Sequence, residues 1–413
     1  MNFKLIAMIA FGIRFVLYTW LEILDSSATK REIPENVRDI YDEEEYRKWQ
    51  AYEGEKKRLS FVKHIISSAV MFLILGFDLY ANVLNLFGAS EDLYRDAMIV
   101  LLADFIISLP YDIPVAYVET MKLEQKYGFN RTTLKTFAVD QMKELVINII
   151  LWCGIVALFI TVHQALGDWL LVVFTGIMLL LALALIFISP LMAKIYNKLD
   201  PLPEGELRSR LTELLESNGC TVRDIKVMDA SKRSSKANAY FTGFGKSKTI
   251  VLYDTLLEQM TEEEIVAVFA HEMGHNKNND TLAGRAISMV GIAVYVVLAW
   301  VLVSVEGIYQ WFGFESINYG FAFILLFSVC LPFVTPFIGM LSNWSSRSRE
   351  YAADRFAAEN GYGEALVTGL KKLSKNSLAC LNPHPLIVKI EYNHPTLSQR
   401  ITALEEFEKS KKS

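Results

Sequence analysis

Cysteine is scarce in this sequence. The 413 residues include only four, which are Cys153, Cys220, Cys330 and Cys380. They are scattered singly along the chain, whereas disulfide-stapled domains and thiolate metal sites place cysteines at short, repeated spacings. The sequence therefore predicts neither a disulfide framework nor a metal site built from cysteines.

An excess of positive charge is also lacking. Lysine and arginine number 41 against 46 aspartates and glutamates, which gives a formal net charge of −5. No basic stripe with interleaved aromatic residues occurs, and such a stripe is the usual electrostatic footprint of nucleic-acid binding. We therefore exclude nucleic acid as a partner.

Charge of either sign is sparse, and long apolar segments take its place. Only 21% of the residues are charged and 52% are hydrophobic, which is too apolar for an ordinary soluble enzyme. The first apolar segment is not expected to be a cleaved signal peptide, because Arg14 interrupts it and no small-residue cleavage site follows. Seven segments are long enough to cross a bilayer: residues 5–24, 63–87, 97–118, 145–163, 169–190, 286–304 and 317–341.

The lysines and arginines alternate between the loops of this predicted membrane protein. They are frequent in segments 25–62, 119–144 and 191–285 and after residue 341, whereas 88–96 holds only Arg95, and 164–168 and 305–316 hold none. Cytoplasmic loops carry the excess of basic residues in membrane proteins. We therefore expect an odd number of crossings, with the amino terminus outside and the carboxyl terminus in the cytoplasm.

Two domains are predicted. Residues 1–200 form an amino-terminal membrane domain with five spans, and residues 201–413 hold the remaining two spans and most of the soluble sequence. Hydrophobic periodicity predicts a mixed α/β soluble part, with a helix at 205–217, strands at 224–228, 237–241 and 249–253, and helical segments near 342–375 and 397–410.

The strongest motif is His271-Glu272-Met273-Gly274-His275. In a helix, residues four apart share a face, so His271 and His275 can both direct a ring nitrogen toward one Zn²⁺ while Glu272 flanks the open position. Thr261 and Glu264 form a capping-box pattern ahead of an apolar run, which predicts that the motif lies in a well-formed helix. This is the core pattern of a zinc peptidase.

Two histidines leave such a site one protein ligand short, because catalytic zinc uses three protein ligands. The third ligand is either another histidine, of which His384 and His394 lie in the predicted cytoplasmic tail, or an acid on a second helix. Glu350 and Asp354 are one helical turn apart, so both can face the same partner helix. Glu350 then suits a ligand and Asp354 a residue that orients a histidine ring.

At this point the sequence resembles a known family, the integral-membrane zinc metallopeptidases called type I CAAX prenyl proteases. The resemblance covers about residues 40–410. Besides the zinc motif it rests on four segments: Lys126–Asn130 with Thr132–Leu134, Asn238–Phe241 with Ile250–Leu257, Glu350–Asp354, and His394-Pro395 with Arg400-Ile401. It implies seven transmembrane helices that form a chamber, with a cytoplasmic gluzincin-like α/β peptidase domain.

The resemblance also implies roles for individual residues. One Zn²⁺ per chain would be held by His271, His275 and Glu350, with Glu272 as the general base. His394 would stabilise the oxyanion, although a structural turn histidine before Pro395 is the alternative. Arg400 would support Glu350 or Asp354, or bind the carboxylate of the substrate.

A substrate-binding strand is predicted beside the metal helix. Asn238, Ala239 and Tyr240 begin a strand to which an extended substrate can add, with Asn238 holding its backbone; an ordinary edge strand is the alternative. Charged residues within the spans call for a partner or a polar cavity. Arg14 is expected either to pair with Asp78, Asp104 or Asp112, or to line a substrate route with them.

Three functions fit these features. The chain trims the ends of prenylated CAAX-type or similar membrane-associated proteins, degrades misfolded membrane chains, or acts as a non-catalytic zinc scaffold. Glu272 disfavours the scaffold, because a structural zinc site needs no general base. The chain ends Ser410–Ser413, without a prenylation box or a retrieval tetrapeptide.

Those absences and the compact length favour a prokaryotic source. In a prokaryote, the degradation of misfolded membrane chains becomes the stronger alternative, because prenylated CAAX proteins are not generally expected there. We expect a multi-pass protein whose active site faces the cytoplasm, in the inner membrane of a prokaryote or the endoplasmic reticulum of a eukaryote. Its partners are then the lipid bilayer and a peptide or protein substrate that is possibly isoprenylated. The sequence predicts no particular oligomeric state.

Overall fold

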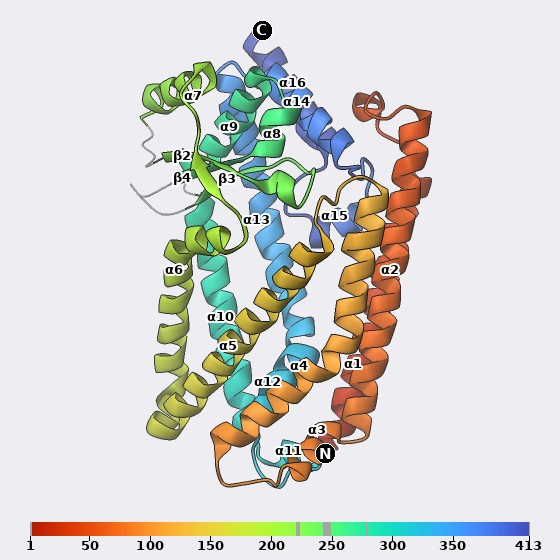
Figure 1. The fold of residues 1–413 in the computed structure, drawn as a ribbon, viewed down its shortest axis with the longest axis vertical. Coiled ribbons are helices and arrows are strands. Elements are labelled where there is room, and N and C mark those ends of the chain that lie inside the picture. The colour runs from red at the N-terminus through yellow and green to blue at the C-terminus, as the bar shows by residue number, and fades with distance from the viewer. Residues whose placement is uncertain (1, 220–223, 243–248, 278–279, 413) are drawn as a thin grey trace.

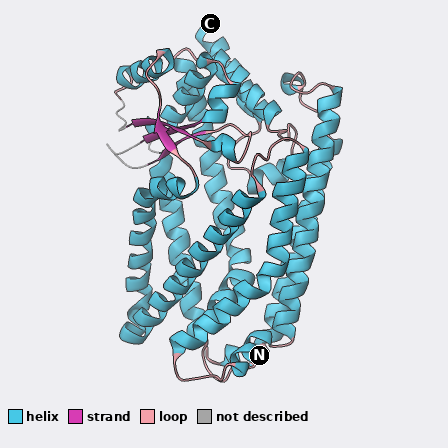
Figure 2. Cartoon of the chain, viewed as in Figure 1, coloured by secondary structure: helices cyan, strands magenta, loops and turns pink. Residues whose placement is uncertain are grey.

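The computed structural model describes residues 2–219, 224–242, 249–277 and 280–412. Long helices run from one end of the molecule to the other, and a small sheet with several shorter helices covers one end (Figure 1). The amino terminus lies at the opposite end from the carboxyl terminus. The strands of the described residues lie at the end that holds the carboxyl terminus (Figure 2).

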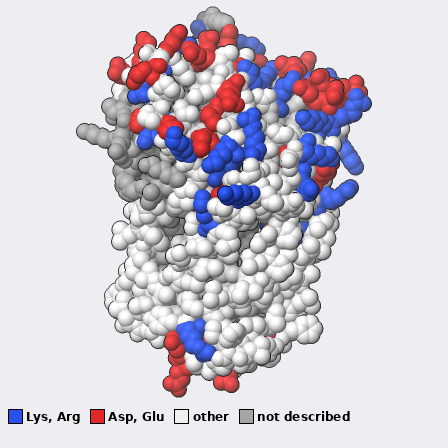
Figure 3. All heavy atoms as spheres, viewed as in Figure 1, with Lys and Arg blue, Asp and Glu red and all other residues white. Residues whose placement is uncertain are grey.

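The helices of the long region are largely apolar. By length and composition, the described residues hold six candidate spans, which are Phe3–Lys30, Glu43–Gly76, Leu93–Glu124, Leu134–Leu185, Ala286–Ser304 and Tyr319–Glu359. Charged side chains gather at the end with the sheet and leave a broad uncharged belt below it (Figure 3). The chain is therefore a mainly helical, multi-pass membrane protein.

Long helices, together with the short α12, make up these spans. They are α1 (Phe3–Ser26), α2 (Glu43–Gly76), α4 (Leu93–Tyr117), α5 (Leu134–Leu166), α6 (Leu170–Tyr196), α10 (Asp280–Ser304), α12 (Tyr319–Leu325) and α13 (Leu331–Glu359). At the end opposite the sheet, the short helix α3 (Leu79–Leu86) lies between α2 and α4, and the short helix α11 (Gly307–Gln310) lies between α10 and α12. Two π-helices, η3 (Val118–Glu124) and η7 (Leu326–Cys330), continue α4 and α12.

One candidate span contains two helices. Leu134–Leu185 covers α5 and most of α6, which are separated by the 3₁₀ turn η4 (Gly167–Trp169). Gly167 has a φ of 52° and a ψ of −127°, a conformation that only glycine adopts readily. The sequence predicted separate spans at 145–163 and 169–190, and this turn divides the two helices at that point.

The last apolar stretch does not end at the predicted boundary near residue 341. Helix α12, the π-helix η7 and α13 together continue from Tyr319 to Glu359. The prediction of a separate helical segment beginning near 342 was therefore wrong. The helix stops near Gly361, whose φ of 88° favours glycine, and α14 (Gly363–Asn376) begins directly after it.

The covering domain holds a four-stranded sheet in the order β1-β2-β4-β3. The strands are β1 (Leu199–Pro201), β2 (Asp224–Met228), β3 (Ala239–Thr242) and β4 (Thr249–Tyr253). Strand β2 is parallel to β4, whereas β1 and β3 are antiparallel to their neighbours. The predicted strands at 224–228 and 249–253 have these bounds, and the third lies at 239–242 instead of 237–241.

Helices complete this domain and surround the sheet. They are α7 (Glu206–Ser217), α8 (Asp254–Gln259), α9 (Glu262–Lys277), α14, α15 (Pro385–Glu391) and α16 (Leu397–Lys412). Their apolar core includes Leu211, Leu252, Phe269 and Leu366, all of which are nearly inaccessible to solvent. A second cluster joins the amino-terminal helices to this domain, with Trp49 and Tyr52 of α2 packed among Leu378 and Ile401.

Charged side chains within the spans have partners other than those expected. The Arg14 Nη1 donates a hydrogen bond to the carbonyl of Ser328, at 3.0 Å, in the π-helix η7. Lys4 pairs with Asp78 at 2.8 Å, Lys63 pairs with Asp112 at 3.5 Å, and Asp104 accepts from the hydroxyl of Tyr80. The predicted pairing of Arg14 with an aspartate is therefore wrong, because that cation serves a backbone carbonyl instead.

Helices α9 and α13 approach each other closely at one glycine. A Cβ atom at Gly274 would lie 2.8 Å from the Cα and 3.2 Å from the Cβ of Ala353, and 3.1 Å from the Cβ of Phe356. Contacts this short to backbone cannot be relieved by turning a side chain. Only glycine at position 274 therefore allows the two helices to pack at this separation.

We predict that Gly274→Ala forces α9 and α13 apart and destabilises the protein by about 1–3 kcal/mol. Thermal unfolding of the purified protein in detergent measures this effect. The matched control is Gly339→Ala on α13, where nothing lies within 4 Å of the added Cβ. Equal thermal stability of both variants and the parent would show that the approach at Gly274 does not limit packing.

Candidate metal centre

The helix that carries the histidines is fixed at its start by a capping box. The Thr261 N–H donates to Glu264 Oε2 at 2.8 Å, and the Glu264 N–H donates to Thr261 Oγ1 at 3.3 Å. Lys372 of α14 also holds the Glu264 carboxylate, at 2.7 Å. This confirms the helix start that the sequence predicted, and it places His271 and His275 on one side of α9.

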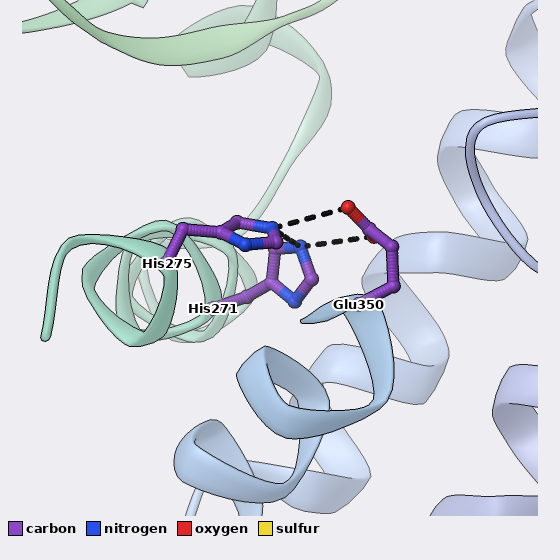
Figure 4. A group of neighbouring side chains, drawn as sticks. All are labelled: His271, His275 and Glu350. Carbon is purple, nitrogen blue, oxygen red and sulfur yellow. Dashed lines mark hydrogen bonds and ion pairs between the residues drawn. The ribbon is translucent and has the colours of Figure 1, made fainter. Parts of the chain in front are cut away.

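A second helix brings an acid to the same point. His275 Nε2 lies 3.1 Å from Glu350 Oε1, and His271 Nε2 lies 3.5 Å from Glu350 Oε2. The two Nε2 atoms are 3.2 Å apart. Figure 4 shows the two rings of α9 and the carboxylate of α13 converging. Within the described ranges, these three residues form a group that could hold a metal ion.

The donor set fits a zinc ion. Zn–N and Zn–O bonds of about 2.0–2.1 Å in a tetrahedron require ligand atoms about 3.3 Å apart, close to the separations of 3.1, 3.2 and 3.5 Å seen here. Glu350 is only 3% exposed, and its Oε2 is buried without a hydrogen bond. A buried carboxylate oxygen without a donor is costly, and a cation between the three groups would remove that cost.

Asp354 and Arg400 lie behind the histidines. His271 Nδ1 is 2.9 Å from Asp354 Oδ1, and the Arg400 guanidinium donates to both carboxylate oxygens of Asp354, at 2.8 and 2.5 Å. Arg400 is 8% exposed and Asp354 is 1% exposed. The hydrogen bonds from Arg400 and the contact with His271 offset the cost of burying the Asp354 carboxylate.

Arg400 was predicted to contact Glu350 or Asp354, or alternatively a substrate carboxylate. Its paired hydrogen bonds go to Asp354, while its Nη1 lies 3.6 Å from Glu350 Oε2. A bidentate arginine fixes the plane of a carboxylate. The described contacts of Arg400 thus match the supporting arrangement, in which α16 holds α13 and α13 holds the His271 ring.

Glu272 follows His271 in α9 and is partly buried. Burial raises its pKa above that of an ordinary glutamate, although the neighbouring histidines act in the opposite direction. A carboxylate with a raised pKa is a better proton acceptor at neutral pH. The raised pKa suits the general-base role that the sequence predicts for Glu272.

His394 lies at the open side of the cluster, in the loop between α15 and α16. Its Nε2 is 3.2 Å from Glu350 Oε1, and its side chain is 52% exposed. The Asn393 Oδ1 accepts a hydrogen bond from the other ring nitrogen, Nδ1, at 2.7 Å. The sequence analysis did not single out Asn393 as a site residue. Its position next to His394 is the one signal that could have pointed to it.

The other histidines lie elsewhere. His384, one of the alternatives for a third ligand, caps α15 by accepting a hydrogen bond from the Leu386 N–H at 3.2 Å. His64 stacks on Phe15, and His163 bonds to the Tyr319 hydroxyl at 2.8 Å. The geometry therefore brings Glu350, and not His384, to the two histidines of α9.

The predicted substrate strand lies at an edge of the sheet. Strand β3 is last in the sheet order, so β4 is its only strand neighbour within the described residues. Asn238 accepts a hydrogen bond from the Tyr253 N–H at 3.0 Å, just ahead of β3. Its side chain is exposed and accepts from the Ala239 N–H at 2.9 Å, while Ala239 is buried and Tyr240 half-buried. Within the described residues, the outer edge of β3 therefore has no strand partner.

Two family models match this chain. The family model described as CAAX prenyl protease N-terminal, five membrane helices, matches residues 22–198. The model described as peptidase family M48 matches residues 201–408. The two matches together include the long apolar helices that follow α1 and every residue of the candidate metal centre.

Curated relatives match over nearly the whole chain. The chain is 32% identical to the CAAX prenyl protease 1 homolog of Oryza sativa subsp. japonica, over 97% of this chain and 96% of that protein. It is 29% identical to CAAX prenyl protease 1 of Saccharomyces cerevisiae, over 93% and 91%. The crystal structure of S. mikatae Ste24p superposes with a TM-score of 0.91 and 26% identity, over 98% and 99% of the two chains. The chain thus belongs to peptidase family M48 and is a membrane metalloprotease of the CAAX prenyl protease kind.

Proposed function

We propose that this protein is a zinc endopeptidase that cleaves near the carboxyl terminus of prenylated, CAAX-type proteins. One observation carries the proposal: the likeness to CAAX prenyl proteases extends through the amino-terminal membrane helices as well as the peptidase part. A general membrane protease needs only the peptidase chemistry. The relatives that share both parts are named for CAAX processing.

His271, His275 and Glu350 are the proposed protein ligands, with one Zn²⁺ per chain. Their mutual distances suit tetrahedral coordination, and Glu350 offers a buried oxygen that lacks a hydrogen bond. Asp354 orients His271 through Nδ1, which selects the tautomer with a free Nε2. Arg400 in turn fixes Asp354.

Zinc bound there would supply a Lewis acid that polarises the scissile carbonyl and makes water more acidic. Glu272 accepts the proton of the attacking water and later delivers it to the leaving amine nitrogen. His394, half-exposed at the rim of the cluster, donates a hydrogen bond to the oxygen that becomes negatively charged. Glu272 and His394 are thus both proposed to act on a substrate bound beside the metal.

The substrate backbone is proposed to add to β3. Asn238 pairs with β4 through its carbonyl, so the alternation of an antiparallel ladder turns the Ala239 N–H and C=O toward the free edge. The Asn238 side chain lies on that edge, over the Ala239 N–H. An extended substrate can replace this contact, with Tyr240 beside it.

The chain is proposed to cross the membrane seven times, because α5 and α6 are separate helices within one apolar stretch. The distribution of lysine and arginine supports a metal centre on the cytoplasmic side. An endoplasmic reticulum location is proposed in a eukaryotic source and an inner-membrane location in a prokaryote. Residues 1–200 and 201–413 are the proposed membrane and peptidase domains.

We predict that Glu272→Gln lowers peptide cleavage by about 10²–10⁴-fold, because it removes the base. Glutamine keeps the shape of the side chain and removes no metal ligand. Zinc content, measured by elemental analysis of the purified protein, is therefore expected to stay at that of the parent. Cleavage at the parental rate would contradict the role of Glu272.

We predict that Glu350→Ala sharply lowers the zinc content, because it leaves two histidines as the only protein ligands. Glu359→Ala is the matched control, since Glu359 lies on the same helix and is exposed. Elemental analysis after brief dialysis against a chelator measures both variants. Parental zinc content in Glu350→Ala would mean that another residue is the third ligand.

The substrate class is tested with matched peptides that carry or lack a carboxyl-terminal isoprenoid. Cleavage that strongly favours the prenylated peptide, and that Glu272→Gln and a zinc chelator abolish, is the expected result. Equal zinc-dependent cleavage of both peptides would instead indicate general membrane proteolysis. Absence of cleavage of either peptide by a zinc-loaded protein would contradict the proposed activity.

A further inference from the structure

A groove on the outer surface of the amino-terminal helices has no role in the proposed reaction. It lies between α2 and the π-helix η3, has a volume of about 350 Å³, and is here called the α2–η3 groove. Its lining combines apolar and basic side chains: Leu59, Val62, Val118 and Leu123, with Arg58, Lys122 and Lys126 at the rim beside Glu55.

Among the described residues, the positive charge of the groove is only partly neutralised. Lys126 pairs with Glu55 at 2.5 Å. Lys122 lies over the Tyr117 ring, with Nζ 5.9 Å from the ring centroid, and in the described part of the chain neither Lys122 nor Arg58 forms an ion pair with a carboxylate. Two exposed cations therefore flank an apolar floor.

The groove faces away from the protein core. Trp49 of α2 is 2% exposed and packs with Leu378 and Ile401. Arg58 follows nine residues later, and at about 100° per residue it lies on the opposite side of the helix. Val62, one turn further, is 44% exposed and is followed by the exposed apolar residues Ile65 and Ile66. The groove therefore opens toward the uncharged belt.

The location of the groove matches the edge of the membrane. Arg58 lies in the charged first half of α2, and the apolar stretch of the helix begins at Phe61. Lysine and arginine side chains gather immediately above the uncharged belt (Figure 3). The opposite wall is a π-helix, a widened form that occurs frequently at functional sites.

We propose that the α2–η3 groove binds an anionic phospholipid, with its phosphate held by Arg58 and Lys122 and an acyl chain against Leu59, Val62 and Val118. The charge and the apolar floor together match a headgroup joined to a hydrocarbon chain. Basic pockets between transmembrane helices, at the membrane surface, are known to suit anionic headgroups. The proposal requires the membrane placement of the helices, and it is independent of which peptide is cleaved.

Lipid retention by the purified full-length protein tests this site. Native mass spectrometry counts the lipids that remain bound after exposure to phosphatidylglycerol or to phosphatidylcholine with identical acyl chains. We expect the parent to retain phosphatidylglycerol preferentially. Arg58→Gln with Lys122→Gln is expected to weaken that retention by about fivefold for each lost cation.

The matched control replaces one arginine and one lysine outside the groove, Arg47→Gln with Lys135→Gln, and should retain the lipid as the parent does. Equal retention by both double variants would overturn the proposal, and so would equal binding of the two lipids. Competition by inorganic phosphate alone, with no dependence on acyl chains, would assign the site to a soluble anion instead. Binding is measured without substrate, so a failure here leaves the peptidase proposal unaffected.

Discussion

The candidate metal centre depends on how closely α9 approaches α13. The two histidines belong to one helix and Glu350 to another, so the donor atoms meet only if the helix backbones nearly touch. Gly274 makes this possible, because the Cα of Ala353 occupies the space that a Cβ would need. The glycine inside the His271–His275 motif is thus a packing residue, and its neighbours in the motif are the proposed metal ligands and general base.

Further contacts hold this helix pair in place from two sides. Lys372 of α14 fixes the first turn of α9 through Glu264. Arg400 of α16 fixes Asp354, which contacts the His271 ring. The buried Arg400–Asp354 pair is fully hydrogen-bonded on the carboxylate, which offsets the cost of removing both charges from water. Helices α14 and α16 therefore hold the candidate metal centre in place through these contacts.

Much of this arrangement could be predicted from sequence because it depends on local periodicity. The capping box of α9, the four-residue spacing of His271 and His275, and strands β2 and β4 each follow from residues near one another in the chain. From the residues alone, the candidates for the third ligand were the histidines of the tail, His384 and His394, and the acids Glu350 and Asp354, which lie one helical turn apart. The family resemblance then selected Glu350.

What could not be predicted depends on contacts between distant segments. The partner of Arg14 is the backbone carbonyl of Ser328 in a π-helix, and a pattern of side chains cannot predict a backbone partner. The end of α13 was missed because a polar stretch after an apolar span looks like a new element, although the helix simply continues. The role of His384 as a helix cap depends on backbone geometry at Pro385.

The continuity of α12, η7 and α13 has a mechanical consequence. Glu350 stands 31 residues beyond Tyr319, which is about 46 Å along a helix, so a tilt of about 5° displaces its end by about 4 Å. Metal coordination tolerates only about 0.2 Å, so α9 must follow α13 whenever the span tilts. Transmembrane helices adjust their tilt to bilayer thickness. A change in the thickness of the host membrane can therefore displace Glu350 relative to the histidines. The close contact between α9 and α13 at Gly274 limits that displacement, because it makes the two helices move together.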